Sequence, residues 1–150
     1  MSSRTFVKTQ IVPLGLALLL LSMSACGFPR GESKSLKQVL ETARSRYKAV
    51  QHVAIENDAV EDRLLTILKT LEALEKANGA HAEKLASLGK DLAEIIPHAG
   101  YTVRPALNEL MKQYLAMSKE ENPNHNASLL LASRTYSILA SELETTRFKL

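Results

Sequence analysis

Apolar residues recur at alternating intervals of three and four over a stretch of the chain that contains no proline, from residue 31 to residue 96. Two such series follow one another: Leu36, Leu40, Ala43, Tyr47, Val50 and Ala54, and then Val60, Leu64, Ile67, Leu71 and Leu74. This spacing places apolar side chains on one face of an α-helix. No segment of useful length alternates apolar and polar residues in the manner of a half-buried strand. The pattern therefore predicts an all-α fold.

The two apolar series are out of phase with each other, which leaves two interpretations of the region between them. One is a long, partly coiled-coil-like first helix over residues 35–77 that ends at Asn78-Gly79. The other is a break at Asn57-Asp58, with Asp58 and Glu61 at the spacing of a capping box. We favour the continuous helix. Its first half then keeps an apolar stripe partly uncovered, which predicts self-association or a partner helix.

Three further helices are expected after this one, each bounded by a residue that starts or stops a helix. One, at about residues 80–96, ends at Pro97; the next has Pro105 in its first turn; the last is capped by Asn126. Because the connections between these helices are short, consecutive helices are expected to be antiparallel. The fold predicted for residues 35–150 is therefore an antiparallel helical bundle.

The N-terminal residues differ in character from the rest of the chain. Arg4 and Lys8 make the first ten residues basic, and residues 11–23 form an uncharged apolar run of 13 residues. As a helix this run extends roughly 20 Å, which is short of the ~30 Å hydrocarbon core of a bilayer. A basic start followed by a short apolar core is typical of an export signal rather than of a membrane span.

This segment ends with Met23-Ser24-Ala25-Cys26, and Cys26 is the only cysteine in the chain. The arrangement resembles the lipobox of bacterial lipoprotein precursors, with Met23 where leucine is most typical. The resemblance implies a signal peptide over residues 1–25, cleavage between Ala25 and Cys26, and a lipid on the Cys26 thiol. Residues 26–34 would then form a lipidated N-terminus and tether.

The residue after the cysteine bears on the location of the mature protein. Gly27 is not the aspartate that retains the best-studied lipoproteins in the inner membrane. In a cell with two membranes, the resemblance therefore implies an exported protein on the outer membrane that faces the periplasm. An acylated Cys26 could serve neither as a nucleophile nor as a metal ligand.

Charge and motif content argue against several classes of function. Without residues 1–25 the chain has 17 basic and 16 acidic residues, which argues against nucleic acid as a partner. A single cysteine excludes a disulfide framework and a multi-cysteine metal site. The sequence has no phosphate loop, dinucleotide fingerprint or HExxH motif. We therefore expect no enzyme activity, no cofactor and no metal.

The positions of the histidines nevertheless leave one alternative function open. His81 opens the second predicted helix and His125 follows the third, so antiparallel packing places both at one end of the bundle. His98 is expected at the opposite end, about 25 Å away by helical rise. The alternative function is accordingly a bundle lipoprotein that binds a small ligand or a metal.

The connection from residue 97 to residue 104 holds the densest group of potential contact side chains, namely His98, Tyr101 and Arg104. Tyrosine and arginine are favoured at the centres of protein interfaces, so these three are the candidate partner-contact residues. Residues 30–48 also hold six basic against two acidic residues, which suits contact with anionic head groups. The predicted function is a membrane-anchored, non-catalytic interaction or scaffold module of the bacterial envelope, with a protein partner or self-association.

Overall fold

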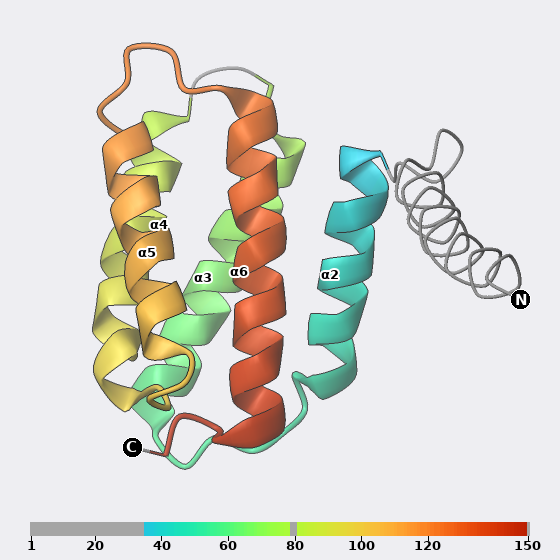
Figure 1. Cartoon of the computed structure of the whole chain (residues 1–150), viewed down its shortest axis with the longest axis vertical. Helices are drawn as coiled ribbons and strands as arrows, with labels where there is room; N and C mark the ends of the chain where they lie inside the picture. Colours follow the sequence, from blue (N-terminus) through green and yellow to red (C-terminus); the bar gives the residue numbers. More distant parts are fainter. Residues whose placement is uncertain (1–34, 79–80, 150) are drawn as a thin grey trace, which may run out of the picture. The chain divides into compact units, whose positions relative to one another are not determined.

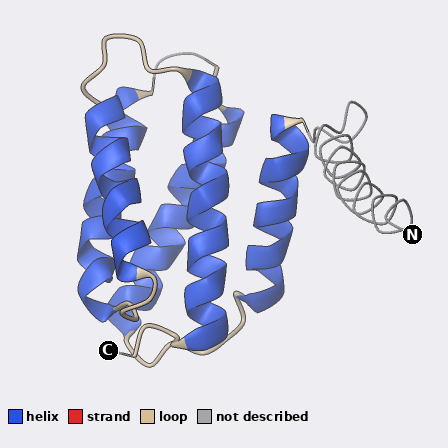
Figure 2. Cartoon of the chain, in the orientation of Figure 1, coloured by secondary structure: helices blue, strands red, loops and turns tan. Residues whose placement is uncertain are grey.

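The computed structural model describes residues 35–78 and 81–149, and Figure 2 shows helices and connections but no strand in these ranges. The helices are α2 (Leu36–Val50), α3 (Asp58–Lys76), α4 (Ala82–Ile95), the short 3₁₀ helix η1 (Ile96–His98), α5 (Arg104–Met117) and α6 (His125–Thr145). The all-α prediction is confirmed. The predicted signal peptide with its lipobox (residues 1–25) and the tether (residues 26–34) lie outside the described residues, as does Gly79. None of the described helices is both long enough and apolar enough to cross a bilayer.

Consecutive helices run in opposite directions, as the short connections predict (Figure 1). Helices α3, α4, α5 and α6 form a four-helix bundle in which α3 also contacts α6. Helix α2 packs on α6 and runs in the same direction as α6 (Figure 1). This parallel pair follows from the odd number of long helices, because the first and the fifth point the same way.

The prediction of a continuous first helix over residues 35–77 is wrong. Helix α2 ends at Val50, and α3 begins only after a seven-residue connection, residues 51–57. The Asn57 side chain caps α3, accepting hydrogen bonds from the backbone N–H groups of Ala59 (3.1 Å) and Val60 (3.3 Å). The break lets two apolar series that are out of phase face the same core, which one straight helix could not do.

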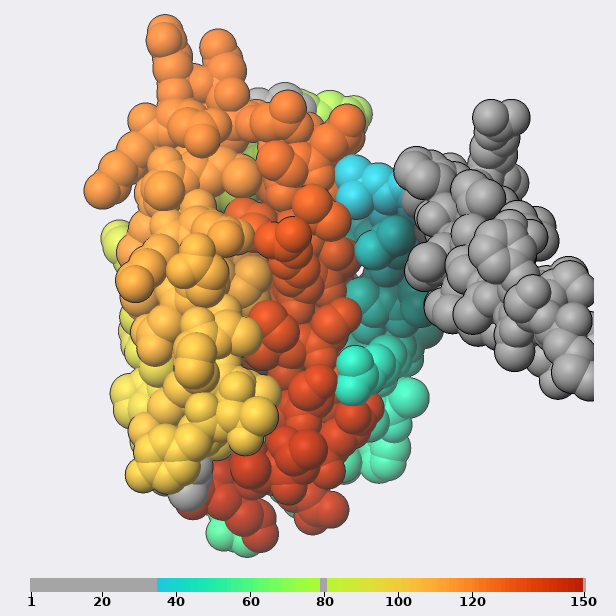
Figure 3. Space-filling view, in the orientation of Figure 1, coloured from blue at the N-terminus to red at the C-terminus, as the bar shows by residue number. Residues whose placement is uncertain are grey.

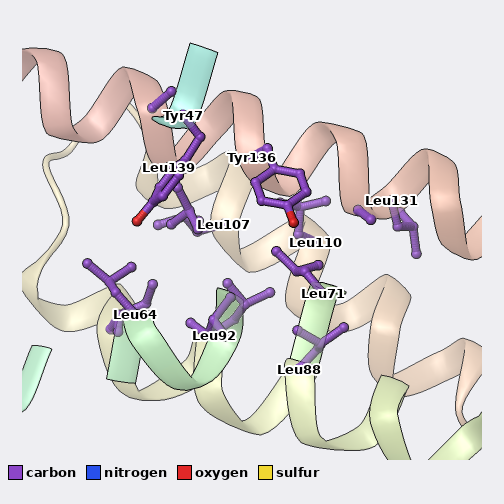
Figure 4. Close-up of a cluster of buried hydrophobic side chains, with 14 of the residues drawn as sticks. Tyr47, Leu64, Leu71, Leu88, Leu92, Leu107, Leu110, Leu131, Tyr136 and Leu139 are labelled. Carbon is purple, nitrogen blue, oxygen red and sulfur yellow. The ribbon is translucent and has the colours of Figure 1, made fainter. Parts of the chain in front are cut away.

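The uncovered stripe expected on the first half of that helix is also absent from the described residues. Leu40, Ala43 and Tyr47 are buried, and Tyr47 meets Tyr136 of α6 with ring centroids 6.0 Å apart (Figure 4). The stripe that we expected to attract another molecule is therefore covered by this one. Because the stripe is covered, it gives no reason to expect self-association.

Ion pairs fasten α2 along both of its edges. Arg44 pairs with Glu75 of α3, and the same carboxylate accepts a hydrogen bond from the Tyr136 hydroxyl at 3.0 Å. On the other edge, Nη2 of Arg46 lies 2.7 Å from Oε2 of Glu144 on α6. This contact raises the pKa of Arg46 and lowers the pKa of Glu144, in each case chiefly through the hydrogen bond between them.

Leucines from all four helices of the bundle fill the centre of the core (Figure 4). All five members of the second apolar series, from Val60 to Leu74, are buried, as are Tyr114 and Tyr136. Pro105 lies in the first turn of α5, as predicted. The cap of α6 differs from the prediction, because Asn124 rather than Asn126 accepts the hydrogen bond from the Ala127 N–H group.

The inner face of α6 carries three polar residues spaced seven apart, Ser128, Thr135 and Glu142, which we call the polar seam. None of the three is exposed to solvent. The seam meets His81 at one end and the Tyr114 hydroxyl, 2.7 Å from Oγ1 of Thr135, in the middle. Sliding α6 by one turn would leave these groups unpaired, and each unpaired group costs about 1–3 kcal/mol. The seam therefore favours a single register of α6.

Two residues with left-handed backbone conformation, Arg147 (φ 57°) and Phe148 (φ 56°), follow the end of α6. The Arg147 N–H group donates to the carbonyl of Glu142 at 2.8 Å, and this turn brings the Phe148 ring back into the core. The conformation is unfavourable for a residue with a side chain.

Replacing Arg147 with glycine is expected to raise the free energy of unfolding by about 1 kcal/mol, since glycine adopts this conformation without steric cost. Urea denaturation of the two proteins measures the difference. Arg147→Ala is the matched control, because it removes the same side chain but keeps the strain. Equal stability of the glycine and alanine variants would contradict the prediction.

The three core tyrosines predict a loss of stability at high pH. Burial raises the pKa of Tyr47 to about 12 and raises the pKa values of Tyr114 and Tyr136 as well, the latter also through the Glu75 carboxylate. In the unfolded chain each tyrosine has a pKa of about 10. The folded protein therefore retains protons that the unfolded chain releases, and its stability falls as pH rises above about 10.

Together the three tyrosines are expected to lower the free energy of unfolding by up to about 4 kcal/mol per pH unit between pH 10 and pH 12. Urea unfolding at a series of pH values measures this slope. Tyr47→Phe, which keeps the ring and removes the titrating group, is expected to lower the slope by about a third. A slope that the variant does not change would contradict this account of Tyr47.

Candidate partner-contact site

The loop that joins η1 to α5 lies at the end of the bundle opposite to the start of α2 (Figure 1). Two of the three predicted contact residues come together there. The guanidinium carbon of Arg104 lies 4.7 Å from the centre of the Tyr101 ring, within the range of a cation–π contact. Tyr101 is 76% exposed, the largest exposed fraction among the large hydrophobic residues described.

The Arg104 side chain also ties the loop to itself. Its Nε donates to the carbonyl of Ala99 at 2.8 Å, and its Nη2 donates to the carbonyl of Pro97 at 2.9 Å. The backbone N–H groups of Val103 and Arg104 both donate to the carbonyl of Gly100 at 3.1 Å. The aromatic ring is thus exposed on a loop that is held by its own hydrogen bonds.

Glu142 anchors this loop from beneath. The carboxylate is completely buried, and its Oε1 accepts hydrogen bonds from the N–H groups of Gly100 (2.9 Å) and Phe148 (3.1 Å) and from the Thr146 hydroxyl. Oε2 has no hydrogen-bond partner among the described residues. A Cβ atom at Gly100 would lie 2.8 Å from Oγ1 of Thr146, so only glycine fits this close approach. One buried carboxylate therefore holds both the contact loop and the C-terminal turn.

No motif in the sequence identifies Glu142 as an anchor. The available signal is its position seven residues after Thr135 and fourteen after Ser128, on the face of α6 that also carries Leu139 and Leu143. For a polar residue, recurrence with the period of a buried stripe indicates burial more clearly than the residue type does.

His98, the third predicted contact residue, belongs to a different feature of the surface. It lines a hollow of about 500 Å³ whose other lining residues are Glu56, Asn57, Asp58, Ala59, Phe148 and Lys149. An ion pair between Lys149 and Glu56, at 3.1 Å, closes one side of the hollow. The lining does not include Tyr101 or Arg104, so the structure divides the predicted trio into a pair and a separate histidine.

The two histidines predicted to share one end of the bundle do meet there. The ring centroids of His81 and His125 lie 5.1 Å apart, and the rings are arranged edge to face. Nε2 of His81 is 2.9 Å from Oγ of Ser128, whose hydroxyl is itself within reach of the carbonyls of Asn124 and His125. The part of the chain that the structure describes holds no group of three or more His, Cys, Asp or Glu residues suited to a metal ion.

The basic residues early in α2 are partly used within the bundle. Arg44 and Arg46 form the two ion pairs that fasten α2. Lys37 and Lys48 remain exposed cations of this helix, and neither forms an ion pair with another described residue. The surface charge available for anionic head groups is therefore smaller than the sequence indicates.

Comparison of the chain with protein-family models, with curated proteins and with solved structures finds no match. The functional conclusion accordingly depends on the geometry and the chemistry of the Tyr101 loop and of the residues that hold it.

Proposed function

We propose that this chain is a membrane-anchored lipoprotein of the bacterial envelope whose helical domain binds a protein partner through the pair Tyr101 and Arg104. The observation that carries the proposal is an exposed tyrosine on a loop that is fastened from within by Arg104 and Glu142. A loop of this kind has little conformational entropy to lose on binding, which favours affinity.

The position of the loop agrees with attachment to a membrane through the other end of the domain. The chain enters α2 at one end of the bundle, and the loop between η1 and α5, which carries Tyr101, lies at the opposite end (Figure 1). α5 alone, with 14 residues, separates the two ends by about 20 Å. A lipid on Cys26 would therefore leave the Tyr101 loop free to meet a partner.

A photo-reactive amino acid at Thr102, next to an unaltered Tyr101, tests the proposed contact in living cells. Thr102 is exposed, so the substitution leaves the buried anchor intact. We expect one crosslinked protein at this position and none at Leu130, a matched exposed site on α6. Adding Tyr101→Ala to the same protein should reduce the crosslinked product about tenfold or more. An equal yield with and without Tyr101→Ala would show that the loop is not the contact.

Replacing Cys26 with alanine is expected to abolish lipid attachment and processing between Ala25 and Cys26. The reason is the lipobox-type sequence at residues 23–26, in which the thiol is the acceptor of the lipid. Metabolic labelling with a radioactive fatty acid and phase partitioning in detergent measure the two effects. Ser24→Thr is a neighbouring control that keeps the thiol. Normal processing of Cys26→Ala would contradict the lipoprotein assignment but would leave the Tyr101 contact testable.

A further inference from the structure

Helix α2 lies outside the ring that the other four long helices form. Helices α3 to α6 contact one another in a closed ring, whereas α2 packs on the side of α6 that faces away from α5 (Figure 3). The seam between α2 and α3 is open, because a hollow of about 380 Å³ lies near each end of it. Leu36 and Leu40 line the first hollow, and Tyr47 and Leu65 line the second.

The surface under α2 has a distinct chemical character. Its apolar part receives Leu40, Ala43 and Tyr47. Its polar part presents two carboxylates, Glu75 on α3 and Glu144 on α6, which pair with the arginines of α2. An occupant of this surface must therefore be an amphipathic helix with basic residues beside its apolar stripe. Helix α2 itself fits this description, with four basic residues and a single acidic residue.

The connection between α2 and α3 is long enough to let α2 leave its own bundle. Seven residues span up to about 23 Å when extended. None of these seven residues is fully buried, and within the connection the Val53 N–H group donates to the Val50 carbonyl at 3.1 Å. Besides that hydrogen bond, straightening the connection breaks the ion pair between Glu56 and Lys149 and the partial packing of Ile55 against the core.

We propose that the surface covered by α2 also accepts the α2 helix of a second copy of this chain, so that two copies exchange their α2 helices. The second copy is the occupant because its α2 carries the same apolar stripe and the same arginines. This helix therefore restores every contact that the surface makes with its own α2. Exchange of identical elements is a low-cost route to a dimer.

The balance between the closed monomer and the exchanged dimer depends on concentration. A short connection holds α2 near its own site at an effective concentration of about millimolar, so the closed monomer dominates in dilute solution. Two variants with complementary charge reversals shift this balance. In Arg44→Glu/Arg46→Glu, α2 meets like charges on its own bundle, and in Glu75→Arg/Glu144→Arg the bundle repels its own α2.

When these two variants are mixed, exchange restores opposite charges at all four contacts. The α2 with glutamates meets the arginines of the second variant, and the unaltered α2 of the second variant meets the original Glu75 and Glu144. Full-length chains, in enough detergent for less than one chain per micelle, are followed by native mass spectrometry. We expect the mixture to contain about a hundredfold more dimer than either variant alone.

The transfer of α2 itself separates exchange from ordinary surface contact. A protease site in residues 51–57 of an isotope-labelled first variant allows its α2 to be cut free after mixing. The labelled α2 is expected to stay with the tagged bundle of the second variant. A dimer in which the cut α2 remains with its own bundle would overturn the proposal, as would the absence of dimer.

The matched control is Lys37→Glu/Lys48→Glu, which changes the charge of α2 by the same amount at cations outside the two ion pairs. Mixed with Glu75→Arg/Glu144→Arg, it is expected to give no more dimer than the second variant alone. Dimer at the level of the main mixture would show non-specific charge attraction and would overturn the proposal. Should a double variant lose its helical circular dichroism, the exposed pair alone, Arg46→Glu with Glu144→Arg, repeats the test.

Discussion

Replacing Glu142 with alanine is expected to lower the free energy of unfolding by about 3 kcal/mol. The change removes the acceptor for the N–H groups of Gly100 and Phe148 and for the Thr146 hydroxyl, and it leaves those donors around a site that is closed to water. Urea denaturation measures the loss. Amide hydrogen exchange should be accelerated by the substitution, relative to the unaltered protein, more strongly at Gly100 and Phe148 than at the centre of α6.

Two controls isolate the role of the buried carboxylate. Glu142→Gln keeps an oxygen at the Oε1 position, so it is expected to lose less than half as much as alanine. Glu144→Ala, two residues away, removes a partly exposed carboxylate whose ion pair contributes about 0–1 kcal/mol. If the alanine variants at 142 and 144 are equally stable, Glu142 does not anchor the loop.

Replacing Leu40 with aspartate is expected to detach α2 from the bundle, with a loss of about 3–4 kcal/mol of α2 docking free energy. Leu40 is 6% exposed, and a carboxylate at this position would lose most of its water where an apolar side chain now packs. Because α3 to α6 form a closed ring, they are expected to remain folded. Hydrogen exchange should therefore become fast throughout α2 while the amides of α3 to α6 stay protected.

Leu130→Asp is the control for this change, since it introduces the same charge on a residue of α6 that is 40% exposed and lines neither hollow of the seam. Its effect on stability is expected to be within about 0.5 kcal/mol. Complete unfolding of Leu40→Asp would mean that the bundle depends on α2. Unchanged protection of α2 would mean that Leu40 does not hold it.

The features predicted correctly from the sequence depend on local physics. The stripe from Val60 to Leu74 has the spacing of one helix face, and all five residues are buried. Pro97 and Pro105 mark helix boundaries because proline lacks the N–H group that a helix interior requires. The meeting of His81 and His125 follows from antiparallel packing and the positions of the loops alone.

The break after Val50 could not be decided locally. A phase shift between two apolar series is compatible with an overwound helix and with a loop, and the sequence around Asn57 suits both. Packing decides between them, because only a loop lets both Leu40 and Leu64 enter one core. The capping box expected for a break used Asp58 as the cap, whereas Asn57 caps α3 in the structure.

The polar seam was missed for a related reason. Serine, threonine and glutamate are ordinarily assigned to solvent, and their burial is favourable only when partners are available. The partners of Ser128, Thr135 and Glu142 lie 47, 21 and 42 residues away, at His81, Tyr114 and Gly100. Sequence spacing carries no information about such pairings. The lipid on Cys26 and the contact at Tyr101 stay predictions.

The parallel alignment of α2 with α6 sets how the domain would bear tension. A pull between the first residue of α2 and the Tyr101 loop acts along the helix axes, because the two points lie at opposite ends of the bundle (Figure 1). Such a pull slides α2 lengthwise against α6 instead of peeling it off from one end. Sliding strains the contacts of Leu40, Tyr47, Arg44 and Arg46 all at once, whereas peeling would break them in turn. A chain held at one end and loaded at the other is thus strongest along the direction in which it would be stretched.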